Sequence, residues 1–389
     1  MQTPGRCMLR IERITLREIR LPLREPFRIS SGVVDERRIA LLELAEADGA
    51  VAWSECVAGE YPNYSSETID TAWHAITEWV APRVLGHSFN DPRDVFPALE
   101  RDFRGHLMAK AAVEMGGWVL AAEKIGTSLA NLLGGTRPQI ATGISLGIQR
   151  SPEGLVDKAR EAIASGYRKV KIKITPGADV AYVGAVRSAL GPGAPLMADA
   201  NNAYTLADAR HLAQLDAFGL MMIEQPLAFD DLVQHAELQR HLSTPICLDE
   251  SITSVDRARD MLTLGSGRIV NIKPGRVGGF AASLAIHDLC EKKAIPVWCG
   301  GMLESGVGRA CNVALASLRN FTKPGDVSPS ARYWERDIVK PEWTMSADGM
   351  VDVPLDRPGL GVDVDRGRVD DLTVRLKVLT APRRGEAAA

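Results

Sequence analysis

The fold is decided by five short apolar runs, each with a charged residue at or next to its end: KVKIKI at Lys169–Ile174, LMAD at Leu196–Asp199, LMMIE at Leu220–Glu224, ICLD at Ile246–Asp249 and IVNIK at Ile269–Lys273. The charged ends follow one another at intervals of 24 to 26 positions: Lys173, Asp199, Glu224, Asp249 and Lys273. Such an interval is typical of one strand, one helix and two short loops. The stretch therefore predicts a repeating strand–helix unit.

The segments between these runs have helical patterns. Val183, Val186 and Leu190 share one helical face before Gly191 ends the pattern, and Ser254 can cap another helix. Strands that alternate with helices predict a parallel sheet, and runs that are apolar on both faces are typical of strands covered by helices. We therefore expect an α/β fold built on a (β/α) barrel of the TIM type.

The charged strand ends predict a metal site. The active site of such a barrel lies at the C-terminal ends of its strands, so Asp199, Glu224 and Asp249 should lie side by side with a lysine on either flank. Three buried like charges are unfavourable unless a cation neutralises them. Oxygen ligands favour Mg²⁺, with Mn²⁺ or another divalent ion as a substitute. The alternative is that each acid is only a polar strand end facing solvent, which explains one acid better than three.

A metal flanked by two lysines suits one kind of chemistry. A divalent ion can bind a substrate carboxylate and stabilise the enolate that forms when the α-proton leaves. Lysines on opposite sides could remove a proton from one face and return it to the other. The arrangement suits racemisation, and equally a dehydration in which one lysine is the base and the other stabilises charge.

Several motifs resemble those of a known family. Five of these motifs are KIK at 171–173, ADANNAY at 198–204, IEQP at 223–226, LDES at 248–251 and NIKPGRVGG at 271–279. These motifs resemble the enolase superfamily and, within it, the muconate-lactonizing subgroup. VWCGGMLESGVGR at Val297–Arg309 resembles the N-succinylamino acid racemase and o-succinylbenzoate synthase family. The resemblance extends from about Ile11 to about Val362.

The resemblance implies a modified (β/α)7β barrel and an α+β capping domain. We expect residues 1–135 to form the capping domain and residues 136–325 the barrel. Residues 326–389 should return to the capping domain and end in a disordered tail from residue 381. Strand-like runs at 14–16 and 39–44 belong to the cap, with Asp48-Gly49 as a hairpin turn and Arg24–Arg37 as a polar loop.

The catalytic candidates are Lys173 and Lys273. Strand alternation puts Lys171 and Lys173 on one face and points Glu250 away from Asp249, so Glu250 is left out of the metal ligands. By resemblance, Lys171 is a second-layer charge beside Lys173. The role of Glu304 stays open.

Substrate contacts are expected from several loops. By resemblance, Ser145 and Asn201 line the substrate site, and two capping-domain loops carry Phe27 and Tyr61 over the barrel mouth. Backbone N–H groups at Gly301 can bind a carboxylate or amide, and the next two residues, Met302 and Leu303, would form apolar walls. The alternatives are a capping serine, a glycine turn without a ligand and aromatic side chains that only anchor their loops.

The composition argues against a nucleic-acid-binding protein and against a membrane-spanning protein. A net charge of −3 gives no basic excess for nucleic acid, and no run of 18 apolar residues predicts a membrane span. The six cysteines include no CxxC pair, which indicates reduced thiols in a cytoplasmic protein. We expect a small-molecule carboxylate substrate, an N-succinyl or N-acyl amino acid or the precursor of o-succinylbenzoate. By resemblance, the chain should form a homo-oligomer.

The residues leave several activities open. None of the seven histidines lies at an expected strand end, which disfavours a base like that of mandelate racemase. Racemase and synthase (the latter a step of menaquinone biosynthesis) would use the same residues. A muconate cycloisomerase-like enzyme, a dipeptide epimerase-like enzyme and a catalytically silent binding barrel are the alternatives. The sequence RNFTKPGDVSP after Leu318 lacks the DxD of the epimerases.

Overall fold

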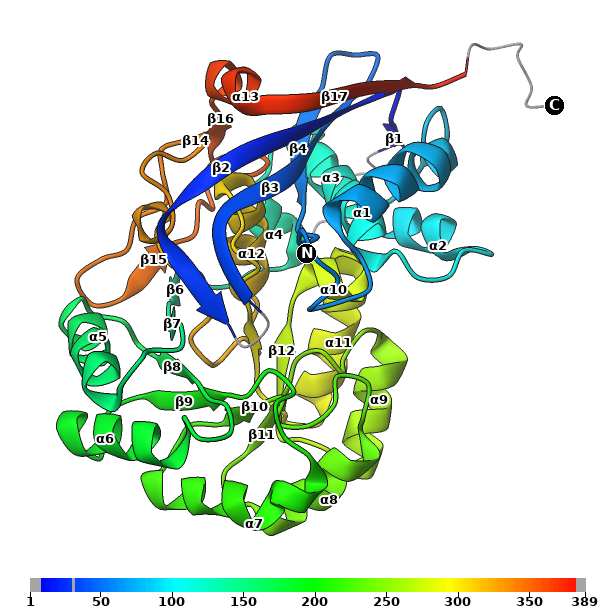
Figure 1. The fold of residues 1–389 in the computed structure, drawn as a ribbon. Helices are drawn as coiled ribbons and strands as arrows, with labels where there is room; N and C mark the ends of the chain where they lie inside the picture. Colours follow the sequence, from blue (N-terminus) through cyan, green and yellow to red (C-terminus); the bar gives the residue numbers. More distant parts are fainter. Residues whose placement is uncertain (1–7, 30–31, 383–389) are drawn as a thin grey trace.

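The structure is a computed structural model that describes residues 8–29 and 32–382. A barrel of parallel strands lies on one side and an antiparallel sheet with its own helices on the other (Figure 1). The carboxyl ends of the barrel strands face this second unit, which we call the cap. The candidate site lies between them.

The barrel is built from parallel strands that are neighbours in chain order. Its described strands are β7 (Ile144–Leu146), β8 (Val170–Lys173), β9 (Leu196–Asp199), β10 (Ile223–Glu224), β11 (Ile246–Leu248), β12 (Ile269–Ile272) and β13 (Val297–Cys299). Their inward-facing apolar side chains form a separate buried cluster: Met197, Met222, Cys247, Ile269 and Trp298. The predicted parallel sheet is confirmed.

Residues 321–326 take the place of an eighth strand. Phe321 forms a parallel bridge with Val297 of β13, and Gly325 forms one with Thr142 before β7. The Asp326 N–H donates a 2.8 Å hydrogen bond to the carbonyl of Cys299. This segment therefore joins the two edge strands and closes the barrel, as the (β/α)7β prediction requires.

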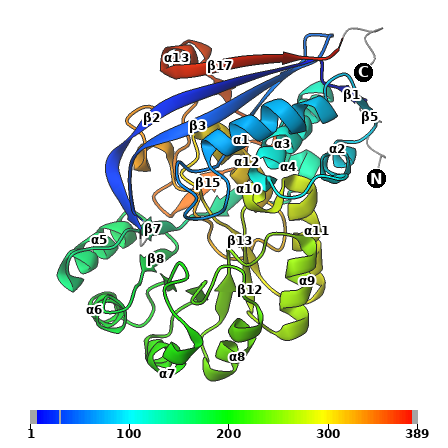
Figure 2. The ribbon, with the colours of Figure 1, turned by 45° about the vertical axis from the view of Figure 1, so that its right-hand side comes forward.

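Helices cover the outside of the barrel (Figure 2). They are α5 (Pro152–Ala164), α6 (Val180–Leu190), α7 (Ala209–Leu212), α8 (Val233–His241), α9 (Val255–Leu264), α11 (Phe280–Lys292) and α12 (Gly306–Ala316). The short α10 (Pro274–Val277) instead follows Lys273 at the barrel mouth and packs against the cap. The predicted start and stop signals are confirmed. Ser254 accepts a hydrogen bond from the Arg257 N–H at the start of α9, and α6 ends at Gly191.

The cap is a four-stranded antiparallel sheet with helices packed against it. Its strands, in spatial order, are β17 (Thr373–Thr380), β2 (Arg13–Ile29), β3 (Gly32–Ala45) and β4 (Val51–Cys56). Its helices are α1 (Ile69–Ala75), α2 (Val95–Glu100), α3 (Leu107–Lys124) and α4 (Leu129–Leu133). Helix α3 is almost wholly buried because it lies between this sheet and the barrel side of the molecule.

The prediction of a polar loop at Arg24–Arg37 is wrong. Strands β2 and β3 continue through it as a two-stranded ribbon, with Phe27 opposite Val34 and a register shift after Pro22. Backbone hydrogen bonds hold such a ribbon whatever its side chains, so polar composition did not reveal it. Residues 30 and 31 of the expected loop lie outside the described residues.

The segment after residue 326 contacts both units. Strand β17 joins the cap sheet, whereas β15 (Met350–Asp352) pairs with β6 (Gln139–Ala141) at the entry to the barrel. Other short elements include β1 (Leu9–Arg10), β5 (Ser88–Phe89), β14 (Val339–Lys340), β16 (Asp363–Val364) and α13 (Arg366–Leu372). The domain boundaries at 135 and 325 stay predictions. Of the expected disordered tail, residues 383–389 lie outside the described residues.

Candidate active site

A cavity of about 390 Å³ lies between the carboxyl ends of the barrel strands and the cap. It brings together nearly all residues singled out from the sequence. Those that line it are Phe27, Tyr61, Ser145, Lys171, Lys173, Asp199, Asn201, Asp249, Lys273, Gly301, Met302 and Leu303. The remaining one, Glu224, is completely buried just beneath, next to Lys171.

Strand register aligns the charged residues. Lys173 lies opposite Asp199, and Asp199 lies opposite Glu224. Glu224 lies opposite Cys247, so Asp249 follows two positions further on, beyond the end of β11. The predicted row of charged strand ends therefore exists, with Asp249 raised toward the cap.

Each acid is paired with a lysine. Lys173 Nζ lies 2.7 Å from Asp199 Oδ2, and Lys273 Nζ lies 2.7 Å from Asp249 Oδ2. Lys171 Nζ lies 3.1 Å from Glu224 Oε2 and 3.3 Å from Asp199 Oδ2. The shared contact with Asp199 confirms that both lysines of β8 occupy one strand face.

Burial and mutual repulsion perturb these acids. Burial, together with the neighbouring Asp199, raises the pKa of Glu224 to about 8. Burial would raise the pKa of Asp199 as well, but Lys173 and Lys171 outweigh it and lower that pKa. Burial lowers the pKa of Lys273, yet Asp249 overrides burial and raises it. The ammonium form of Lys273 is stabilised because it pairs directly with that carboxylate.

The prediction that Glu250 points away is wrong. Strand β11 ends at Leu248, so strand alternation no longer applies two residues later. Glu250 Oε1 accepts hydrogen bonds from the side-chain amides of Asn201 (3.4 Å) and Asn202 (3.2 Å). Burial and the neighbouring Asp249 raise the pKa of Glu250 to about 7. Glu250 thus belongs to the acidic group of the site.

The donor set fits a divalent cation. Asp199, Glu224 and Asp249 offer only oxygen, are buried and come from adjacent strands. The negative charges of Asp199 and Asp249 both raise the pKa of Glu224, so added positive charge would relieve repulsion. In the part of the chain that the structure describes, the carboxylates turn to their lysines, and no three acidic, His or Cys side chains converge as metal ligands.

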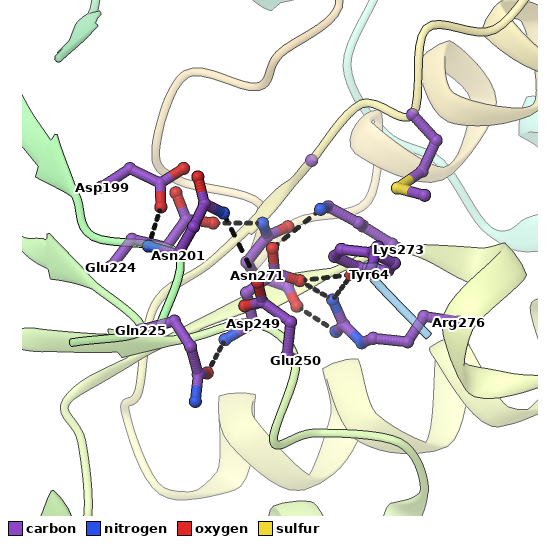
Figure 3. Close-up of polar contacts among 12 residues, drawn as sticks. Tyr64, Asp199, Asn201, Glu224, Gln225, Asp249, Glu250, Asn271, Lys273 and Arg276 are labelled. Atoms are coloured by element: carbon purple, nitrogen blue, oxygen red, sulfur yellow. Dashed lines mark hydrogen bonds and ion pairs between the residues drawn. The ribbon is translucent and has the colours of Figure 1, made fainter. Parts of the chain in front are cut away.

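Three further side chains contact Asp249, Glu224 or Lys273 (Figure 3). Tyr64, from a cap loop, donates a 2.8 Å hydrogen bond to Asp249 Oδ1, and Arg276 donates to the same oxygen. The Tyr64 ring lies 4.3 Å from Lys273 Nζ. Asn271 Nδ2 donates a 2.7 Å bond to Glu224 Oε1. The cap thus contributes directly to the acid–lysine group.

Asp326, which also lines the cavity, forms a second charged group with two lysines. It lies 2.7 Å from Lys171 Nζ and 3.0 Å from Lys169 Nζ. Lys169 is completely buried, with its ammonium 3.5 Å from the centroid of the Trp298 ring. Burial lowers the pKa of Lys171, but Asp326 and the acids Glu224 and Asp199 raise it well above its ordinary value. Lys171 is therefore held as an ammonium.

The predicted substrate walls surround the charged centre. Ser145 Oγ is buried without a hydrogen-bond partner, and Lys173 Nζ lies 2.5 Å from Asn201 Oδ1. Phe27 is half-buried and Tyr61 is exposed at the rim of the cavity. Leu303 has a positive φ of 56°. The roles of these residues in substrate binding stay predictions.

The sequence reasoning missed Tyr64, Glu250, Asn271, Arg276 and Asp326. Local signals existed for two of them, because Asn271 lies two positions before Lys273 on the same strand face and Arg276 lies in the NIKPGRVGG motif. Tyr64 and Asp326 have no such signal. Their contacts depend on the cap docking and on barrel closure.

Comparisons with known proteins agree over nearly the whole chain. Residues 11–134 match the mandelate racemase / muconate lactonizing enzyme N-terminal domain, and residues 154–368 match the enolase C-terminal domain-like family. An o-succinylbenzoate synthase from Geobacillus kaustophilus is 49% identical over 365 residues, covering 94% of this chain and 96% of that protein. An N-succinylamino acid racemase from Thermus thermophilus is 46% identical over 373 residues, covering 96% of this chain and 100% of that protein.

Solved structures agree as well. A crystal structure of an enolase superfamily member from Listeria innocua superposes with a TM-score of 0.92 at 38% identity, covering 95% of this chain and 99% of that chain. No helix among the described residues is both long enough and apolar enough to cross a bilayer.

Proposed function

Because this chain belongs to the mandelate racemase / muconate lactonizing enzyme family of the enolase superfamily, we propose that it abstracts a proton α to a carboxylate. The substrate we propose is an N-succinyl or other N-acyl amino acid, which the enzyme racemises. Synthesis of o-succinylbenzoate by dehydration is a shared or principal activity. Relatives 45–49% identical carry both names, which supports each.

The observation that carries the proposal is the position of two lysines on opposite sides of three carboxylates. Lys173 ends β8 and contacts Asp199, whereas Lys273 follows β12 and contacts Asp249. A planar carbanion between them would have a nitrogen on each face. Both ammonium groups reach the same cavity, which has room for a small carboxylate.

We assign Asp199, Glu224 and Asp249 as ligands of a Mg²⁺ ion, with Mn²⁺ as a substitute. A bound ion of this kind supplies positive charge opposite the negative charge that develops on the substrate carboxylate. The lysines do the proton chemistry. Each needs to be a neutral amine to accept a proton, and the carboxylates beside it stabilise the ammonium that results.

Racemisation uses both lysines in one turnover. The neutral amine of one lysine takes the α-proton and becomes an ammonium, and the opposite ammonium gives a proton to the other face and becomes an amine. The product leaves with inverted configuration, and the two lysines have exchanged protonation states. Dehydration needs only one lysine as the base. The ammonium formed on that lysine then gives its proton to the hydroxyl group, which leaves as water and restores the amine. The opposite ammonium stabilises the negative charge meanwhile.

The test follows the α-proton of N-succinyl-L-phenylalanine in D₂O with Mg²⁺, by NMR and optical rotation together. Proton exchange with loss of rotation establishes racemisation. Exchange with retained rotation means that one base reaches the substrate, which favours dehydration as the main reaction. An enzyme that neither exchanges this proton nor dehydrates the synthase substrate contradicts the proposal and favours a binding barrel without catalysis.

A cytoplasmic location and homo-oligomeric assembly are also part of the proposal. The location is supported by Cys56, Cys247, Cys290, Cys299 and Cys311, which are buried and unpaired in the described chain. Light scattering on the purified protein tests the assembly. A monomer at micromolar concentration would contradict it.

A further inference from the structure

The cavity wall at Gly301–Leu303 has no regular secondary structure, so something else must hold it. Leu303 adopts a left-handed backbone conformation with φ of 56°, which a residue with a branched side chain rarely takes. Such a conformation persists only where the surroundings enforce it. The next residue, Glu304, supplies a contact that holds this wall.

Glu304 folds back onto its own loop. Its Oε1 accepts a 2.7 Å hydrogen bond from the Met302 N–H and a 2.9 Å bond from Asn312 Nδ2 of helix α12. Glu304 is 2% exposed. One carboxylate oxygen therefore links the middle of the cavity wall to a barrel helix.

Glu304 is itself fixed from several directions. Its backbone carbonyl accepts hydrogen bonds of 3.3 Å from Arg309 Nη2 and from Trp334 Nε1. The neighbouring Ser305 donates a 2.6 Å bond to Glu55 at the end of cap strand β4, and Glu55 also accepts from the Gly308 N–H at the start of α12. The anchor of the wall thus spans both units of the molecule.

We propose that Glu304 is a positioning residue that holds the Met302–Leu303 wall and thereby sets which substrate side chain the site accepts. Met302 and Leu303 line the cavity as apolar groups, so they contact an apolar part of the substrate. Glu304 does not line the cavity, so it acts through them. The inference rests on the proposed function, because it concerns the specificity of that same reaction.

Two substitutions distinguish the effect of the hydrogen bond between Met302 and Glu304 from the effect of the volume of the Glu304 side chain. Glu304→Gln keeps an oxygen that can accept from Met302, and Glu304→Met fills similar space without an acceptor. For E304M we expect KM for N-succinyl-phenylalanine to rise about tenfold, because the Met302 N–H loses its hydrogen-bond acceptor, with kcat within about threefold. KM for N-succinyl-alanine should change much less, and E304Q should behave like the wild type with both substrates.

Glu114→Met is the matched control. Glu114 is also a buried carboxylate that accepts backbone N–H groups, from Phe280 (2.7 Å) and Ala281 (2.9 Å), but it does not line the cavity. E114M should lower the melting temperature and leave the ratio of KM values for the two substrates unchanged. An equal change of that ratio in E114M and E304M, or no change in E304M, overturns the proposal.

A second readout works without catalysis. Amide hydrogen exchange of peptides covering residues 300–305 should be slow in the wild type and E304Q and faster in E304M. Peptides of α3 should be unaffected. If the wild type has no turnover with either substrate, the proposed function fails, and this exchange pattern still decides whether Glu304 holds the wall. Unchanged exchange in E304M overturns the positioning role.

Discussion

The hydroxyl of Tyr64 donates a 2.8 Å hydrogen bond to Asp249 Oδ1, although the two residues lie 185 positions apart in the chain. The same tyrosine ring lies 4.3 Å from the ammonium of Lys273. A cap residue therefore touches both a candidate metal ligand and a candidate base. Catalysis should depend on cap docking as well as on the barrel.

Tyr64→Phe removes the hydrogen bond to Asp249 and keeps the ring beside Lys273. We expect kcat/KM to fall about tenfold, which corresponds to the free energy of one hydrogen bond to a charged group. Tyr64→Ala should cost clearly more, because the cation–π contact is lost as well. Steady-state kinetics of both variants tests this. Equal losses in the two would mean that the ring contributes nothing.

The two lysines should be required together for racemisation. Lys173→Ala and Lys273→Ala should each lower kcat for both antipodes by at least about 10³-fold, because a general acid–base group is lost. Each variant should still exchange the α-proton of one antipode with solvent deuterium, since one base suffices for that half-reaction. The exposed Lys292→Ala serves as the control. Wild-type turnover of both antipodes in either variant would contradict the two-base mechanism.

Removal of the metal should abolish activity. A chelator is expected to inactivate the enzyme, and Mg²⁺ or Mn²⁺ to restore it. Asp249→Asn should weaken Mn²⁺ binding by at least about tenfold in equilibrium dialysis, because a carboxylate ligand is lost. Asp371→Asn, at an exposed site, should bind Mn²⁺ like the wild type. Full activity after thorough chelation would exclude the metal assignment.

A methyl group at Gly300 should disturb Lys273. An added Cβ would lie 2.4 Å from Asn271 Oδ1 and 2.6 Å from Lys273 Cε, both closer than van der Waals contact allows. Gly300→Ala should therefore lower kcat more than about tenfold, since a displaced base loses its alignment. Gly193→Ala, where an added Cβ meets nothing within 4 Å, is the matched control. Equal kcat in the two variants would contradict this account.

Glu114 should make stability depend on pH. Burial raises the pKa of Glu114 from 4.5 to about 7, although Ala281 and Phe280 donate backbone hydrogen bonds to it. The folded protein then keeps a proton that the unfolded chain releases, so the unfolding free energy falls as pH rises from about 4.5 to about 7. The melting-temperature advantage of the wild type over Glu114→Gln should shrink between pH 5 and pH 8. An advantage that is constant or grows would contradict the raised pKa.

The sequence by itself determined the parallel barrel and the charged centre. Apolar runs of strand length at intervals of 24 to 26 residues specify strand–helix units, and the carboxyl ends of parallel strands meet at one edge. Lys173, Asp199 and Glu224 are therefore neighbours by register alone. The starts and ends of helices could also be predicted from the sequence, because capping residues act within one turn of the chain.

Only the tertiary structure decided what surrounds that centre. The contact of Tyr64 with Asp249 depends on how the cap docks, and the ion pair of Asp326 with Lys171 depends on closure of the barrel. Glu250 turned inward because its strand ends before it, a boundary that apolar pattern does not locate. Side-chain periodicity reports the face of a regular element, whereas contacts between distant segments depend on packing, which no local pattern encodes.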